Sequence, residues 1–190
     1  MADTEYWGQG TWSDDRLVGY PEVKLRHPMV GEDVGFLGAY FNDAGVNPMH
    51  DDFFDPFSEE APAVLGVARD EAPDFAVSLH SRMPAPGILR PSYVPLEVQE
   101  EVRALAVRYN HALEAKGLPT SPLPPVRPDQ GDPPPYFNLV SALYHSGGVT
   151  AFTHENTHGA AGYVELTLEQ IIDVELTLYE SMLRHALEGR

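Results

Sequence analysis

The sequence predicts an α/β fold in which a mixed sheet is flanked by helices. Three segments carry this prediction: a helical pattern at 58–73 that leads into an apolar strand at 75–81, a second strand at 149–155, and a long helix at 167–188. A helix that feeds a buried strand is the repeating unit of α/β proteins. The 190 residues, 43% of them hydrophobic, are enough for one domain with its own core.

The first part of the chain has no clear hydrophobic period. Residues 1–33 mix Gly, Trp, Tyr and Asp, so we expect an irregular N-terminal arm there and place the domain at 34–190. The stretch 34–41 is apolar and aromatic and stops at an Asn-Asp-Ala-Gly turn signal. This pattern predicts a strand that ends in a turn.

A helix and a strand should follow next. Ser58 is a candidate N-cap, and Pro73 closes the helical pattern. The nearly continuous apolar run at 75–79 is typical of a strand buried on both faces. His80 follows at the carboxyl end of this strand, which is where open α/β sheets place their ligand sites.

The second half of the chain alternates loops with regular elements. Two Pro-rich loops, at 83–95 and 118–135, flank a predicted helix at 95–116. A second helical pattern at 136–148 stops at two glycines, and the β-forming residues of 149–155 then predict a strand. The final helix begins with a capping box formed by Thr167 and Gln170, and it ends at Gly189.

Composition excludes several classes of function. The net charge of -17 disfavours binding to a phosphate backbone, so no nucleic-acid partner is expected. The chain has no cysteine, which excludes disulfides, thiolate metal sites and a Cys nucleophile. No apolar run approaches the roughly 20 residues that span a membrane, and the polar, acidic start does not resemble a signal peptide. We therefore expect a cytoplasmic protein without membrane contact.

Residues 154–158 read His-Glu-Asn-Thr-His, which matches the H-E-x-x-H zinc signature. That chemistry requires a helix, so that His154 and His158 lie on one face with Glu155 as the base. The preceding residues are β-formers and two glycines follow, which favours a strand that ends at Glu155. On a strand, His154 and Glu155 point to opposite faces. A zincin-type metalloprotease remains an alternative.

Four segments together resemble the zinc carboxypeptidases, over roughly residues 34–188. They are "GAYFNDAGVNPMHDDFFDP" at 38–56, "DFAVSLHS" at 74–81, "YHSGGVTAFTHENTHG" at 144–159, and the helix after "ELTLEQ". Their order along the chain matches the order of the family: turn segment, His strand, Glu strand and closing helix. The resemblance implies a carboxypeptidase-like, phosphorylase/hydrolase-like α/β fold that acts on peptide or amide bonds.

The resemblance also implies roles for individual residues. His80 corresponds to a ligand of Zn²⁺, and Glu155 to the general base that activates a zinc-bound water. Ser81 follows the ligand histidine and can contact substrate, as can Tyr144 and His145. His50 lies where the family has an Asn-Arg pair that binds the substrate carboxylate. It is therefore a further candidate for substrate binding.

The chain departs from the family pattern in two ways. No H-x-x-E motif precedes His80, so two of the three expected zinc ligands are missing, and no arginine lies near His50. We expect a second metal ligand in His158, and the wider set of possible substitutes is His50, Asp51, His145, His154 and His158.

The missing motif indicates an incomplete domain. Such a domain exposes a sheet edge or an apolar face, which predicts a homo-oligomer or a partner chain that supplies the missing elements. The alternative to a hydrolase is an inactive, truncated member of the family that acts as a binding or assembly module.

Overall fold

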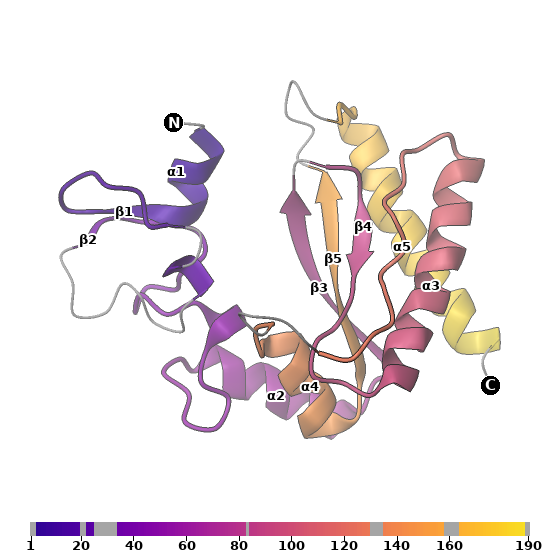
Figure 1. Cartoon of the computed structure of the whole chain (residues 1–190), viewed down its shortest axis with the longest axis horizontal. Coiled ribbons are helices and arrows are strands. Elements are labelled where there is room, and N and C mark those ends of the chain that lie inside the picture. Colours follow the sequence, from indigo (N-terminus) through magenta and orange to yellow (C-terminus); the bar gives the residue numbers. More distant parts are fainter. Residues whose placement is uncertain are drawn as a thin grey trace.

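A three-stranded mixed sheet forms the centre of the molecule (Figure 1). The computed structural model describes residues 3–19, 22–24, 34–82, 84–129, 135–157 and 164–188. Within these, β5 (Thr150–Thr157) is the middle strand, parallel to β3 (Phe75–Arg82) and antiparallel to β4 (Gly87–Leu89). The predicted α/β class, with a mixed sheet flanked by helices, is confirmed.

The burial of β3 differs from the sequence prediction. The apolar run of this strand indicated burial on both faces, but its side chains are mostly only half-buried, and among the described residues β3 pairs only with β5, at the edge of the sheet. Leu79, inside that run, is 48% exposed. The local sequence could not show whether this strand is central or at the edge of the sheet, because its neighbours are strands that lie far away along the chain.

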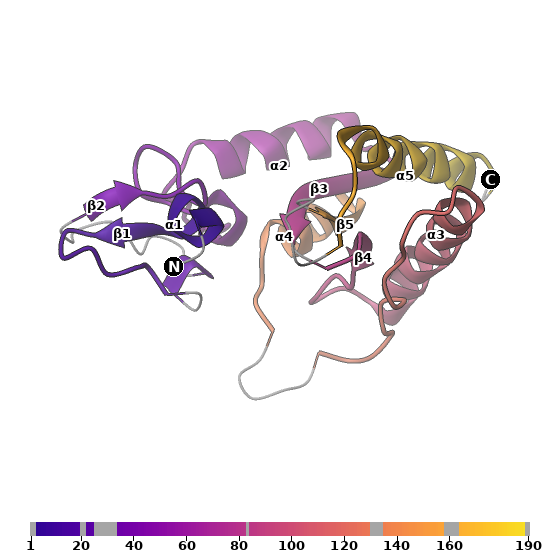
Figure 2. The same cartoon turned by 90° about the horizontal axis from the view of Figure 1, so that it is seen from above.

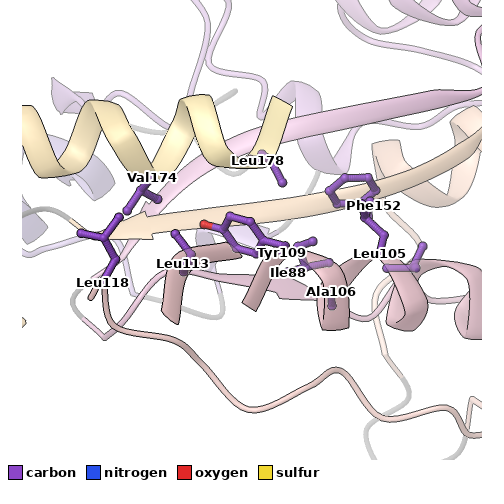
Figure 3. Close-up of a cluster of buried hydrophobic side chains, with 10 residues drawn as sticks. Ile88, Leu105, Ala106, Tyr109, Leu113, Leu118, Phe152, Val174 and Leu178 are labelled. Atoms are coloured by element: carbon purple, nitrogen blue, oxygen red, sulfur yellow. The ribbon is translucent and has the colours of Figure 1, made fainter. Parts of the chain in front are cut away.

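One face of the sheet is covered by α3 (Leu96–Ala115) and α5 (Leu168–Glu188). Their apolar side chains point toward one another beside β5 (Figure 3) and form the main core with Phe152, which is fully buried. The predicted capping box of α5 is present, since Thr167 N donates to Gln170 Oε1 (2.9 Å) and Gln170 N donates to Thr167 Oγ1 (3.3 Å). The closing helix was therefore predicted correctly.

The other face of the sheet is covered by α2 (Glu60–Glu71) and α4 (Leu139–Gly147), so that the sheet lies between two helical layers (Figure 2). Asn138 caps α4, because its side chain accepts a hydrogen bond from Ser141 N, and Gly148 ends the helix in a left-handed conformation. α2 begins two residues after Ser58, whose hydroxyl accepts from Ala61 N at 3.4 Å.

The start of the chain is more regular than predicted. The expected irregular arm contains α1 (Asp3–Gln9), β1 (Gly10–Trp12) and the short helix η1 (Glu22–Lys24). β1 pairs antiparallel with β2 (Val34–Leu37), so strand pairing joins the predicted arm to the first strand of the predicted domain. This N-terminal unit has a small core of its own, formed by Trp12, Val18, Val23 and Phe41.

Two further differences concern short elements. β4 lies inside the segment 83–95, which the sequence indicated as a loop, and β2 is shorter than the predicted strand 34–41. Within the described residues, no helix is both long and apolar enough to cross a lipid bilayer.

Candidate active site

A pocket of about 300 Å³ opens between the N-terminal unit and the carboxyl ends of β3 and β5. Its volume lies at the lower end of the range for small-molecule sites, roughly 300–1,000 Å³. Aliphatic and aromatic side chains form part of its wall. The polar part of its lining includes Lys24, His50, His80, Tyr136, Asn138 and Glu155.

His80 and Glu155 lie side by side in this pocket. They are register partners on the parallel strands β3 and β5, and residues paired in this way project from the same face of a sheet. Ser78, two residues before His80, lies on the same face, with its Oγ 3.0 Å from His80 Nε2. Burial lowers the pKa of His80, which favours a neutral imidazole.

His154 faces the opposite side of the sheet from Glu155. Its side chain is fully buried, and its Nε2 lies 2.8 Å from the hydroxyl of Tyr109 on α3. Its Nδ1 lies 3.6 Å from Glu175 Oε1 on α5. The predicted alternation along this strand is confirmed, and His154 belongs to the packing between β5 and the two helices.

Residues 154–157 are part of β5. The helix required by the H-E-x-x-H interpretation is therefore not formed by these residues, and that interpretation is wrong for them. His158, which we predicted as a second metal ligand, lies outside the described residues.

His50 reaches the pocket at the end of the short helix η2 (Pro48–His50). Its ring packs edge-on against Tyr136, with the ring centroids 5.5 Å apart. Its Nδ1 is buried and has no hydrogen-bond partner among the described residues. The pKa of His50 is lowered to about 4, first by burial and then by the positive charge of Lys24 and the proximity of His80. The imidazole is therefore neutral at neutral pH.

Lys24 contributes the positive charge of the pocket. It lies at the end of η1, and its Nζ is 5.2 Å from the centre of the Tyr136 ring. Asn47 joins η1 to η2, because its Nδ2 donates to Val23 O (2.5 Å) while its Oδ1 accepts from Met49 N (3.0 Å). Sequence reasoning missed Lys24, since nothing near it in the sequence indicates that η1 packs beside the sheet.

The remaining predicted residues lie outside the lining of this pocket. Ser81 follows His80 on β3 and therefore points to the other face. Tyr144 and His145 lie in the last turn of α4, and His145 Nε2 is 2.7 Å from the carbonyl oxygen of Tyr93. Asp51 is buried in a loop, where Ser58 Oγ donates to it at 2.6 Å.

The described residues do not supply a complete metal site. Catalytic zinc is normally held by three protein ligands, and no cluster of three His, Asp or Glu side chains suited to a metal occurs in the described part of the chain. His80 and His50 are the two imidazoles that line the pocket. A third ligand would have to come from outside the described residues.

No family model, curated protein or solved structure matches this chain.

Proposed function

We propose that this pocket is the active site of a carboxypeptidase-like hydrolase of peptide or amide bonds, with Glu155 as its general base. One observation carries the proposal: Glu155 and His80 are register partners on one face of the sheet and line the same pocket as His50. A carboxylate beside neutral imidazoles is a suitable set of groups for proton transfer and for hydrogen bonding to a carbonyl. The resemblance of the Glu strand and the His strand to zinc carboxypeptidases supports the same assignment.

The proposed chemistry is amide hydrolysis with one proton shuttled by Glu155. The ionised carboxylate takes a proton from a water molecule as the water oxygen attacks the carbonyl carbon of the substrate. The protonated Glu155 then gives this proton to the leaving nitrogen as the carbon–nitrogen bond breaks. His50 or His80, as a neutral imidazole, can donate a hydrogen bond to the carbonyl oxygen.

Zn²⁺ is the cofactor implied by the resemblance. When bound, it would polarise the carbonyl and lower the pKa of water. His80 and His50 are its candidate ligands among the described residues, but two ligands are fewer than a catalytic zinc needs. The proton transfers assigned to Glu155 require only its carboxylate and the neighbouring imidazoles.

Lys24 gives the pocket a preference for an anionic substrate group. It is the only Lys or Arg among the residues that line the described pocket, in a chain with a net charge of -17. A lysine ammonium binds a carboxylate as a point charge, without the two parallel hydrogen bonds of an arginine. We propose that the substrate is an amide or peptide with a carboxylate close to the scissile bond.

A second candidate function is a binding module without catalysis. The incomplete metal-ligand set among the described residues favours it. On this proposal, the pocket still takes a small carboxylate ligand at Lys24, but Glu155 only accepts a hydrogen bond from an N–H or O–H group of that ligand.

Two measurements on the purified chain separate these functions. The first is metal content after loading with Zn²⁺ and dialysis. The second is release of free amino acid from N-acylated amino acids and short peptides, followed by mass spectrometry. For a hydrolase, Glu155→Gln should lower turnover by roughly 10²- to 10⁴-fold, while Glu100→Gln on the exposed face of α3 leaves it unchanged.

His80→Ala should also abolish turnover, and it should abolish zinc retention if the metal is bound here. His111→Ala, which removes an exposed imidazole from α3, is the matched control. No turnover of any substrate, with binding of N-acylated amino acids that Lys24→Met weakens, would support the binding module instead. Turnover that Glu155→Gln leaves intact would contradict the proposed active site.

A further inference from the structure

α5 has a second apolar stripe that faces away from the core. Its inner side packs on α3 through Val174 and Leu178, which are fully buried. Its outer side exposes six large apolar side chains: Leu168 (68% exposed), Ile172 (49%), Leu176 (55%), Tyr179 (39%), Leu183 (67%) and Leu187 (74%). Isolated exposed leucines are ordinary, but a stripe along the whole length of a helix is typical of an interaction surface.

The spacing of this outer stripe reads the same in both directions. Successive members are 4, 4, 3, 4 and 4 residues apart, which places all six on one face of the helix. The stripe is therefore symmetric about a point between Thr177 and Leu178. A surface with this symmetry is complementary to a second copy of itself turned by 180°.

In a two-fold symmetric interface, each contact occurs twice: if one residue meets a second residue of the partner, that second residue meets the partner's copy of the first. When two copies of α5 pack antiparallel, Leu168 lies against the partner's Leu187. Ile172 then lies against the partner's Leu183, and Leu176 against the partner's Tyr179. All six apolar side chains of each copy are used in this arrangement, and none is left facing a polar position.

One basic side chain of α5 also favours the antiparallel arrangement. Arg184 lies in the second half of the helix, beside Glu180, with which it forms an i,i+4 ion pair, whereas Glu169 and Asp173 lie in the first half. Antiparallel packing brings Arg184 toward the partner's Glu169 and Asp173, whereas parallel packing would place the two copies of Arg184 side by side.

The area of the stripe reaches the lower end of the range for specific interfaces. The exposed parts of the six side chains add up to roughly 600 Å² per protomer, against the about 800 Å² that each partner contributes to a standard interface. Figure 2 places α5 on the outside of the molecule, next to the carboxyl terminus, where a second copy can approach it.

We propose that the chain forms a two-fold symmetric dimer through antiparallel packing of α5 against α5 of a second copy. This inference rests on the outer stripe of α5 alone and is independent of the function of the pocket. The dimer is the homo-oligomer expected from the sequence, with the outer stripe of α5 as its interface and Leu168 aligned with the partner's Leu187.

The first test is the mass of the chain in solution, measured by sedimentation equilibrium over a hundredfold range of concentration. The unmodified chain should approach twice its monomer mass of 21.0 kDa. The double variant Leu176→Glu, Leu183→Glu should be a monomer with an unchanged circular dichroism spectrum, because both positions are exposed. Val67→Glu, at a 64% exposed position on α2, is the control and should remain a dimer.

The second test uses the absence of cysteine from the chain. An equimolar mixture of Leu168→Cys and Leu187→Cys proteins should form a mixed dimer with a short bis-maleimide crosslinker. Neither protein alone should crosslink, because identical positions lie at opposite ends of the interface. A monomer at every concentration would overturn the dimer. Crosslinking of Leu168→Cys with itself would overturn the antiparallel register.

Discussion

The hydroxyl oxygen of Tyr109 lies 2.8 Å from Nε2 of His154, on the side of the sheet opposite to Glu155. This contact shows why the His-Glu-x-x-His pattern does not act as a unit. Two consecutive residues of a strand point in opposite directions, so His154 enters the core between α3 and α5 while Glu155 faces the pocket. The first histidine of the pattern stabilises the fold, and the glutamate is the candidate for chemistry.

Tyr109→Phe should destabilise the protein without changing the pocket. The substitution removes a hydrogen bond between two fully buried side chains and keeps the ring. A buried polar atom that loses its partner costs about 1–3 kcal/mol in the free energy of unfolding. Urea denaturation at one protein concentration measures this cost. Tyr144→Phe is the control, since the described residues give the Tyr144 hydroxyl no hydrogen bond, and an equal loss in both variants would contradict the prediction.

Helices and strands could be predicted from the sequence where the residues that determine them lie next to one another in the chain. β-forming residues predicted the strand that contains Glu155, and Thr167 with Gln170 predicted the start of α5. The pairing of β1 with β2 could not be predicted. Strands this short show little alternation of apolar and polar residues, and each is stabilised by a partner far along the chain. Lys24 was missed for the same reason. Its place in the pocket depends on a hydrogen bond far along the chain, in which Asn47 Nδ2 donates to the carbonyl oxygen of the neighbouring Val23.

Asp51 is predicted to be a structural residue and not a metal ligand. Its carboxylate is buried and accepts hydrogen bonds from Ser58 Oγ (2.6 Å), Ser58 N (3.0 Å), Phe57 N (2.9 Å) and Asp52 N (2.7 Å). Asp51→Ala should therefore lower the free energy of unfolding by about 3 kcal/mol, because several donors lose a charged acceptor. Thermal or urea denaturation measures the loss. A variant as stable as the unmodified chain would show that these bonds contribute little.

The same carboxylate should make stability depend on pH in the acid range. Burial alone would raise the pKa of Asp51, but the hydrogen bonds from Ser58, Phe57 and Asp52 outweigh it and hold the pKa below its ordinary value of 3.8. Below that value the unfolded chain binds the proton more readily than the folded chain, so stability rises with pH and is lost on acidification. Asp51→Asn should flatten the dependence of the unfolding free energy on pH below about 4.

His50 should titrate far below an ordinary histidine. Burial is the largest cause of its pKa near 4, followed by the positive charge of Lys24. Between pH 6.5 and about 4, the unfolded chain takes up a proton that folded His50 does not, so stability falls as the pH falls through this window. The ring proton signals in NMR spectra give the midpoint directly. Lys24→Met should raise this midpoint part of the way, and a midpoint near 6.5 in the unmodified chain would contradict the prediction.

Gly38 should be essential for the structure of the N-terminal unit, which forms the N-terminal wall of the pocket through Val23 and Lys24. A Cβ at this position would lie 2.4 Å from Gln9 C and from Gly10 N, which are backbone atoms that cannot move aside as a side chain can. Gly38→Ala should therefore disrupt the pairing of β1 with β2, which belongs to the same unit as Val23, the neighbour of Lys24. The expected result is a loss of protection from hydrogen exchange in β1 and β2, with β5 still protected.

The matched control for this prediction is Gly66→Ala in the middle of α2. A Cβ there meets only the end of the Arg69 side chain, at 3.9 Å, and alanine is favoured over glycine inside a helix by about 1 kcal/mol. The two substitutions make the same chemical change and should have opposite effects on stability. If Gly38→Ala leaves exchange in β1 and β2 unchanged, the close approach of the two strands at Gly38 does not determine the structure of this unit. The N-terminal wall would then have to be held by the contact of Asn47 with Val23 instead.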